Sequence, residues 1–106
     1  MERVTEKWFL EHGWRKDISI TNEYGSTRTQ TSFVIGTGTC GGKLWATYAK
    51  VTYARPNEKA STFYTFFAKG RTGFCVDNRF NKSNFDVSTI ISALHTVGYN
   101  EYGKKI

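Results

Sequence analysis

The sequence feature that most constrains the fold is a change of composition at Thr27. From Thr27 onward the chain is rich in Thr, Val, Ile, Phe, Tyr and Trp, which are the residue types favoured in β-strands. Short runs containing Gly, Pro or Asn interrupt this region at regular intervals, as is typical of antiparallel hairpins. The spacing predicts strands at roughly 27–36, 43–55 and 61–70, with a fourth short strand at 73–76. Alternating apolar residues also fit a short strand over 15–21.

A helical pattern precedes the β-rich region. The segment from Thr5 to His12 combines aromatic and acidic residues, and Gly13 follows it. Glycine adopts the left-handed conformation that ends many helices without a steric penalty. We therefore predict a short helix over Thr5–His12, with Trp14 folding back onto its last turn.

A second helical pattern follows the β-rich region. Ser83 and Asp86 are spaced like an N-terminal capping box, and Gly98 is placed to end the helix. Between them the apolar residues recur at the spacing that puts them on one side of a helix. These residues are Val87, Ile90, Ile91, Leu94 and Val97.

These patterns predict the fold class. An amphipathic helix must bury its apolar side, and the sheet is the only large partner available. A chain of 106 residues is long enough for one hydrophobic core, and no linker-like segment divides it. We expect a single α+β domain over residues 1–106, built in two layers. It has an N-terminal helix, a three- to four-stranded antiparallel meander and a C-terminal amphipathic helix packed on the sheet.

The positive charge is unevenly distributed along the chain. The net charge is +6, but residues 28–82 carry nine bases against only Glu58 and Asp77, while the two flanking segments are close to neutral. An excess of one sign attracts polyanions or an acidic protein surface. The alternative interpretation is a solvated face that keeps the protein in solution.

One face of the predicted sheet is expected to be open to solvent. Alternate side chains of a strand lie on opposite faces. We expect the helices to cover the more apolar face of each predicted strand, so that basic and aromatic side chains occupy the other face. The covered residues are Phe33 and Ile35 in the first strand, Trp45, Ala49, Val51 and Tyr53 in the second, and Tyr64, Phe66 and Ala68 in the third. The open face then carries Arg28, Gln30, Tyr48, Lys50, Phe67 and Lys69, with Arg71 near its edge.

Basic and aromatic side chains interleaved on an open sheet form a platform for single-stranded nucleic acid. We therefore predict a non-enzymatic binding module that prefers single-stranded nucleic acid or RNA to duplex DNA. In this hypothesis Tyr48 and Phe67 stack on bases, and the basic residues contact phosphates. The basic residues are Arg28, Lys43, Lys50, Lys69 and Arg71. The competing interpretation is that the rings belong to the core and are covered by lysine stems.

Two motifs carry no cofactor chemistry. Residues 36–41 match the glycine pattern of dinucleotide sites, but such a site needs a following helix, and a β-favouring run follows instead. We predict a hairpin loop. Cys40 and Cys75 are too few for a zinc site and are expected to be free thiols in a reducing, cytoplasmic compartment. No apolar run is long enough to span a membrane. We expect no cofactor, no metal and no membrane partner.

A small ribonuclease is a third hypothesis. General acid–base cleavage needs two groups that converge on one phosphate, yet the basic segment contains no histidine. His12 and His95 are both expected in the last turn of a helix, where a cation suits the helix dipole. The sequence therefore favours a binding protein over an enzyme.

The order helix–strands–helix resembles that of double-stranded RNA-binding domains, which grip phosphates with a lysine-rich start to the last helix. Residues 81–86 contain one lysine and one aspartate instead. The short, basic, Thr- and aromatic-rich sequence is also similar to accessory proteins of phages and mobile elements. That resemblance implies an alternative function, an inhibitor that binds and blocks a larger host protein. A homodimer through an edge strand is a further expectation.

Overall fold

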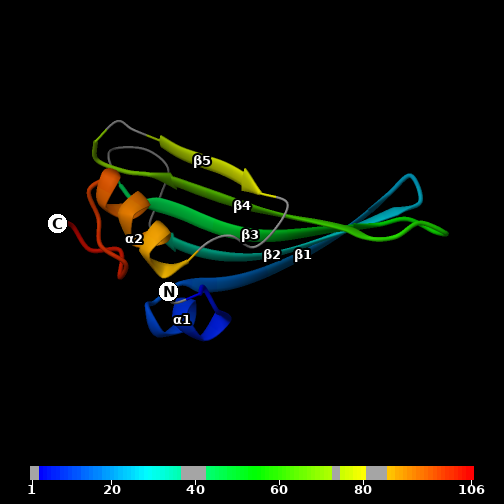
Figure 1. Cartoon of the computed structure of the whole chain (residues 1–106), viewed down its shortest axis with the longest axis horizontal. Coiled ribbons are helices and arrows are strands. Elements are labelled where there is room, and N and C mark those ends of the chain that lie inside the picture. Colours follow the sequence, from blue (N-terminus) through cyan, green and yellow to red (C-terminus); the bar gives the residue numbers. More distant parts are fainter. Residues whose placement is uncertain (1–2, 37–42, 73–74, 81–85) are drawn as a thin grey trace.

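A single antiparallel sheet with two helices forms the fold. The computed structural model describes residues 3–36, 43–72, 75–80 and 86–106. The strands are hydrogen-bonded in chain order, which confirms the predicted α+β antiparallel architecture (Figure 1). The elements are α1 (Glu6–Glu11), β1 (Arg15–Glu23), β2 (Ser26–Gly36), β3 (Trp45–Ala54), β4 (Ser61–Lys69), β5 (Cys75–Phe80) and α2 (Val87–Thr96).

The sheet has five strands rather than the three or four that we predicted. At one edge, β1 runs on to Glu23 because Tyr24 and Gly25 make a two-residue turn in which both have positive φ, 50° and 78°. Turns of this kind match the twist of the flanking strands. At the other edge, β5 contains Asp77 and Asn78, residue types that strands disfavour. Pairing with β4 overrides this local preference.

The two helices cover only part of the sheet. Both lie towards one end, and the hairpins β1–β2 and β3–β4 extend beyond them at the other end (Figure 1). The molecule is accordingly elongated, with extents of 49 × 32 × 22 Å. In the described part of the chain, no helix is long and apolar enough to cross a membrane.

The core lies between the helices and one face of the sheet. Phe9 of α1 is fully buried and stacks on Phe33 of β2 and Tyr48 of β3, with ring centroids 4.6 and 5.3 Å away. Ala46 and Ala68 are cross-strand partners with no exposed surface, and their small side chains leave room for the helices. The fully buried apolar residues of α2 and its C-cap complete the core: Ile90, Leu94 and Val97.

The helix boundaries follow their caps. The side chain of Thr5 accepts a hydrogen bond from the backbone N–H of Trp8 at 3.1 Å and so begins α1. At its end Gly13 has φ +82°, and the ring of Trp14 packs on Phe9 at 4.9 Å, which confirms both expectations. Asp86 caps α2, which begins at Val87.

Parts of the predicted capping box and of the glycine motif lie outside the described residues. Ser83, the other half of the predicted capping box, lies outside the described residues, as does most of the glycine motif at 36–41. Gly36 itself ends β2 with φ +126°, and a side chain there would place its Cβ 2.0 Å from the carbonyl oxygen of Leu44. This position therefore requires glycine.

The burial of Phe9 predicts a sharp contrast with its neighbour. Replacing Phe9 by Ala removes the ring that joins α1 to two strands, and we expect the free energy of unfolding to fall by about 3–5 kcal/mol. Leu10 is 52% exposed, so Leu10→Ala is the matched control and should change stability by less than about 1 kcal/mol. Urea unfolding of both variants measures this difference, and equal decreases would contradict the proposed core.

Asp86 makes stability depend on pH. Hydrogen bonds from the hydroxyl of Ser88 (2.7 Å) and from the backbone N–H and hydroxyl of Thr89 (both 2.8 Å) stabilise its carboxylate and lower its pKa below the usual 3.8. Because the pKa is lower in the folded state, this stabilisation is present above the ordinary pKa and is lost as the pH falls through the folded value.

Asp86→Asn should therefore melt at a lower temperature than the wild type at pH 7. We expect the two melting temperatures to converge as the pH falls below about 4, because protonation then removes the same charge from the wild-type protein. Thermal unfolding followed by circular dichroism at several pH values measures the difference. A difference that is the same at pH 3 and pH 7 would show that the carboxylate charge is not responsible.

Candidate nucleic-acid interface

The sheet face opposite the helices is the candidate site. In an antiparallel pair, residues that lie directly opposite each other point to the same side. Arg28 lies opposite Tyr53, and Gln30 lies opposite Val51, which in turn lies opposite Phe63. The sheet residues that pack against α1 and α2 all belong to the other face. We call the face of Arg28 and Tyr53 the open face.

Two predicted site residues do not lie on this face. Tyr48 is paired with Phe33 and Phe66 on the helix side and is only 7% exposed. Lys50 shares the side of Tyr48, although its own side chain is exposed. Our placement of both residues was wrong because β3 carries apolar residues on both of its sides. We had assigned its other side, which includes Trp45, Ala49, Val51 and Tyr53, to the core.

Other predicted residues lie on the open face but do not form one cluster. Arg28, Gln30, Phe67 and Lys69 share this face, as expected. Along β3, however, Arg28 is level with Tyr53 and Lys69 is level with Trp45, so about 27 Å of strand separates them. Lys43 and Arg71 are exposed outside the strands. The predicted set is therefore spread along the molecule.

A row of stacked side chains crosses the open face. This row was not predicted from the sequence. The guanidinium of Arg28 lies 5.9 Å from the ring centre of Tyr53, whose ring is stacked 5.9 Å from that of Phe63. The guanidinium of Arg79 lies 4.0 Å from the ring centre of Phe63. We call these four residues, one from each of β2 to β5, the arginine–aromatic row. Arg79 was not predicted to lie on this face because the expected fourth strand ended at residue 76, before Arg79.

Hydrogen bonds hold Arg28 in this row. Its Nε donates to the hydroxyl oxygen of Tyr53 at 3.2 Å, and its Nη2 donates to Oε1 of Gln30 at 2.6 Å. The amide nitrogen of Gln30 donates in turn to the hydroxyl of Ser32 at 3.0 Å. This polar chain along β2 holds the guanidinium beside the tyrosine.

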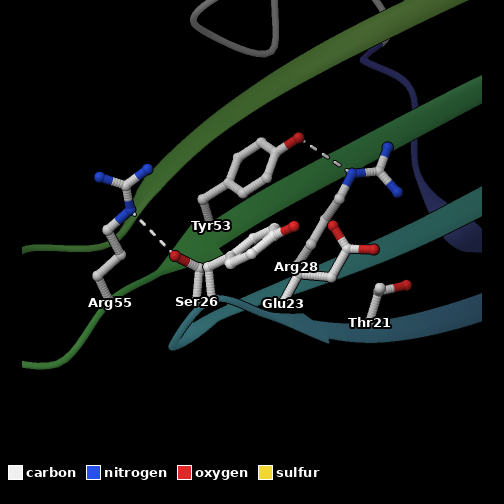
Figure 2. Close-up of a pocket in the computed structure, with 7 residues that line it drawn as sticks. Thr21, Glu23, Ser26, Arg28, Tyr53 and Arg55 are labelled. Carbon is white, nitrogen blue, oxygen red and sulfur yellow. Dashed lines mark hydrogen bonds between the residues drawn. The ribbon is translucent and has the colours of Figure 1, made fainter.

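A groove runs past Tyr53 at the hairpin end of the sheet. Two adjoining cavities, of 470 and 560 Å³, share Tyr53 and Arg55 in their walls. Figure 2 shows the first cavity, where the Arg55 Nε donates to the hydroxyl of Ser26 at 3.0 Å. We call the two cavities together the hairpin groove. The remaining lining residues are Thr21, Glu23, Tyr24, Ser26 and Arg28 in the first, and Glu58, Lys59 and Ser61 in the second.

The groove combines exposed aromatic rings with mixed charge. Tyr53 is 39% exposed, and Tyr24 at the turn is fully exposed. Its bases are Arg28, Arg55 and Lys59, and its acids are Glu23 and Glu58. Other basic residues from the middle of the chain lie outside the groove: Lys50 is on the helix side of the sheet, and Lys43 and Arg71 are in loops. The excess of basic residues is therefore divided between the two faces and the loops. The groove can accept a planar ring beside an anionic group.

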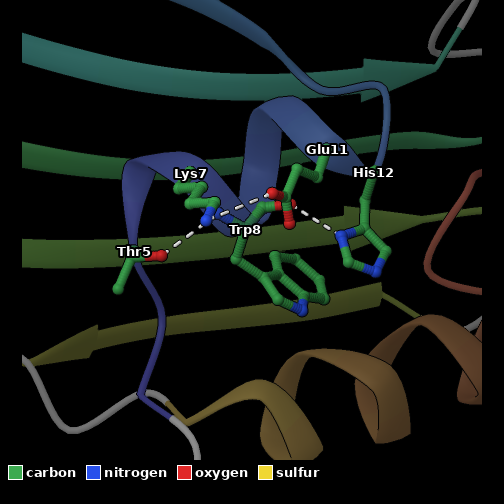
Figure 3. Close-up of polar contacts among 5 residues, drawn as sticks. All are labelled: Thr5, Lys7, Trp8, Glu11 and His12. Atoms are coloured by element: carbon green, nitrogen blue, oxygen red, sulfur yellow. Dashed lines mark hydrogen bonds and ion pairs between the residues drawn. The ribbon is translucent and has the colours of Figure 1, made fainter.

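The two histidines lie away from the groove. His12 caps the end of α1, where its Nδ1 is 2.6 Å from the carbonyl oxygen of Trp8 (Figure 3). Its ring stacks between those of Trp8 and Tyr102, at 4.2 and 4.7 Å. His95 is exposed in the last turn of α2, as predicted. Among the described residues, no group of three or more His, Cys, Asp or Glu residues could hold a metal ion.

The order of elements differs from that of the double-stranded RNA-binding domains, which the predicted order resembles. In the described residues, five consecutive strands lie between the two helices, whereas the double-stranded RNA-binding order has three. No protein-family model, curated protein or solved structure matches this chain.

Proposed function

We propose that the protein binds single-stranded nucleic acid in the hairpin groove. One base stacks on Tyr53, and Arg28 and Arg55 contact the flanking phosphates. The observation that carries this proposal is the exposed ring of Tyr53, which stands between two guanidinium groups in the wall of an open groove. This combination of a stacking surface and cations is the one that proteins use for single strands.

The geometry around Tyr53 suits stacking. Its ring is stacked on that of Phe63 in the neighbouring strand. The tyrosine ring is therefore already held in place, and a base that binds does not have to order it. Arg28 is already held by its hydrogen bonds to Tyr53 and Gln30. A preformed site loses less conformational entropy on binding than a mobile one. Base–aromatic stacking is worth about 1–3 kcal/mol per base.

The two acids of the groove favour a particular orientation of the ligand. Glu23 and Glu58 repel phosphates, but a carboxylate accepts hydrogen bonds from the amino groups of bases. The ligand would therefore direct its bases toward Glu23 and Glu58 and its backbone toward Arg55 and Lys59. The second cavity extends the path beyond Tyr53 towards Lys59.

Substitution of Tyr53 tests the stacking interaction. We expect Tyr53→Ala to weaken the binding of a fluorescently labelled single-stranded oligonucleotide by about 5- to 150-fold, as measured by anisotropy. Tyr53→Phe keeps the ring and should retain most of the affinity. The RNA and DNA versions of the oligonucleotide and the corresponding duplex are compared in the same assay. No binding to any of them at low salt, or an equal weakening in the two variants, would refute the proposal.

The arginines should determine how strongly binding depends on salt. Removing one cation that neutralises a phosphate of a single strand reduces the slope of log affinity against log salt concentration by about 0.7. We expect this reduction for Arg55→Ala. The control is Lys7→Ala, which removes the same charge from a side chain that is 83% exposed on α1, and it should leave the slope nearly unchanged. Equal slopes for Arg55→Ala and the wild type would exclude Arg55 as a phosphate ligand.

The alternative function, inhibition of a host protein, would draw on the same surface. Tyr and Arg are enriched in protein–protein interfaces, and Tyr53, Tyr24 and Arg55 surround the first cavity. A pull-down from nuclease-treated lysate distinguishes the two functions. A stoichiometric protein partner that the Tyr53→Ala variant fails to bind, together with no oligonucleotide binding, would favour the inhibitor.

A further inference from the structure

Strand β1 forms one edge of the sheet and is exposed along its whole length. It pairs with β2 on one side, and the sheet ends there in the described part of the chain. All nine of its residues are exposed, and their pairing with β2 is continuous, without a bulge. A long, regular edge strand has unpaired backbone N–H and C=O groups that can hydrogen-bond to another strand. Two features that often protect edge strands, a proline and a bulge, are missing from β1.

Two large apolar side chains stand on this edge. Ile18 and Ile20 are 55% and 64% exposed. They point to the same side of the sheet, because residues two apart in a strand share a face. Their cross-strand neighbours in β2 are Thr31 and Thr29, which leave the isoleucines without an apolar partner on that side. Burial of both side chains would favour association.

The charges of β1 are complementary to a second copy of the same strand. The strand begins with Arg15 and Lys16 and ends with Glu23. In an antiparallel pair centred on Ser19, Arg15 lies opposite Glu23 of the second copy. Ile18 then lies opposite Ile20 of the second copy, and both contacts occur twice because the pair is symmetric.

The two symmetric registers next to the one centred on Ser19 place charges and isoleucines less favourably. A pair centred on Ile20 would set Asp17 against Glu23 of the other copy, and like charges directly opposite are destabilising. A pair centred on Ile18 would set Lys16 against Ile20 and would leave Glu23 unmatched. Only the register centred on Ser19 satisfies the charges and the isoleucines together.

We propose that two copies of this chain associate through β1 in that antiparallel register. The two five-stranded sheets join into one continuous sheet, with the symmetry axis perpendicular to it. Both open faces then lie on the same side, and the dimer presents two hairpin grooves on one surface. This proposal does not depend on what the grooves bind.

Charge reversal with rescue tests the register. In sedimentation experiments over a range of concentrations, the wild-type chain should form a dimer that dissociates on dilution. R15E and E23R should each weaken the dimer by about tenfold, since each places like charges opposite one another twice. The double variant R15E/E23R restores both pairs in the opposite sense and should return to wild-type affinity. K7E makes the same change of net charge as R15E on α1 and should dimerise normally.

Two results would overturn the proposal. One is a monomeric wild-type chain at every concentration up to about 0.2 mM, where even weak specific dimers are populated. The other is a double variant that remains as weak as either single variant. Circular dichroism of each variant checks that the overall secondary structure is unchanged. Because Glu23 also lines the groove, oligonucleotide affinity is measured on R15E, which lies outside it.

Discussion

The stacking of Phe9 on Phe33 and Tyr48 is the interaction on which the rest of the structure depends. It holds α1 against β2 and β3 through a ring with no exposed surface. Once Tyr48 faces the helices, the pleat of β3 requires Tyr53 to face away from them. One buried stack therefore decides which side of the central strand becomes core and which side is available to a ligand.

The open face remains well packed although no helix of the described chain covers it. Val51 and Ala49 are almost completely buried there, between the larger side chains of neighbouring strands. The arginine–aromatic row and the polar chain from Arg28 to Ser32 add directional contacts to this packing. The groove and the β1 edge both involve the part of the sheet that extends past the helices (Figure 1), where backbone and rings are accessible.

Local signals predicted the elements better than the faces. Thr5, Gly13 and Gly98 marked helix ends correctly, because caps act over a few residues. Only the start of strand β5 was predicted, as the end of a strand at 73–76, because Asp77 and Asn78 disfavour strands and the pairing of β5 with β4 is a long-range effect. Among the proposed binding residues, Arg28 was identified from the alternation of β2. Tyr53 was assigned to the core, and Arg55 was not singled out, since it lies in a turn whose neighbours only the folded chain brings together.

The sequence by itself determined that the middle of the chain forms antiparallel strands, with turns after β1 and between β3 and β4, and that a helix precedes and follows them. Those properties depend on residue propensities and on periods of two and 3.6 residues. Only the tertiary structure decided which side of β3 packs against the helices, because both sides carry apolar residues and the choice depends on the fit of Phe9 against Tyr48. The same choice placed Tyr53 between Arg28 and Arg55, and the order of the strands left Ile18 and Ile20 at the edge of the sheet.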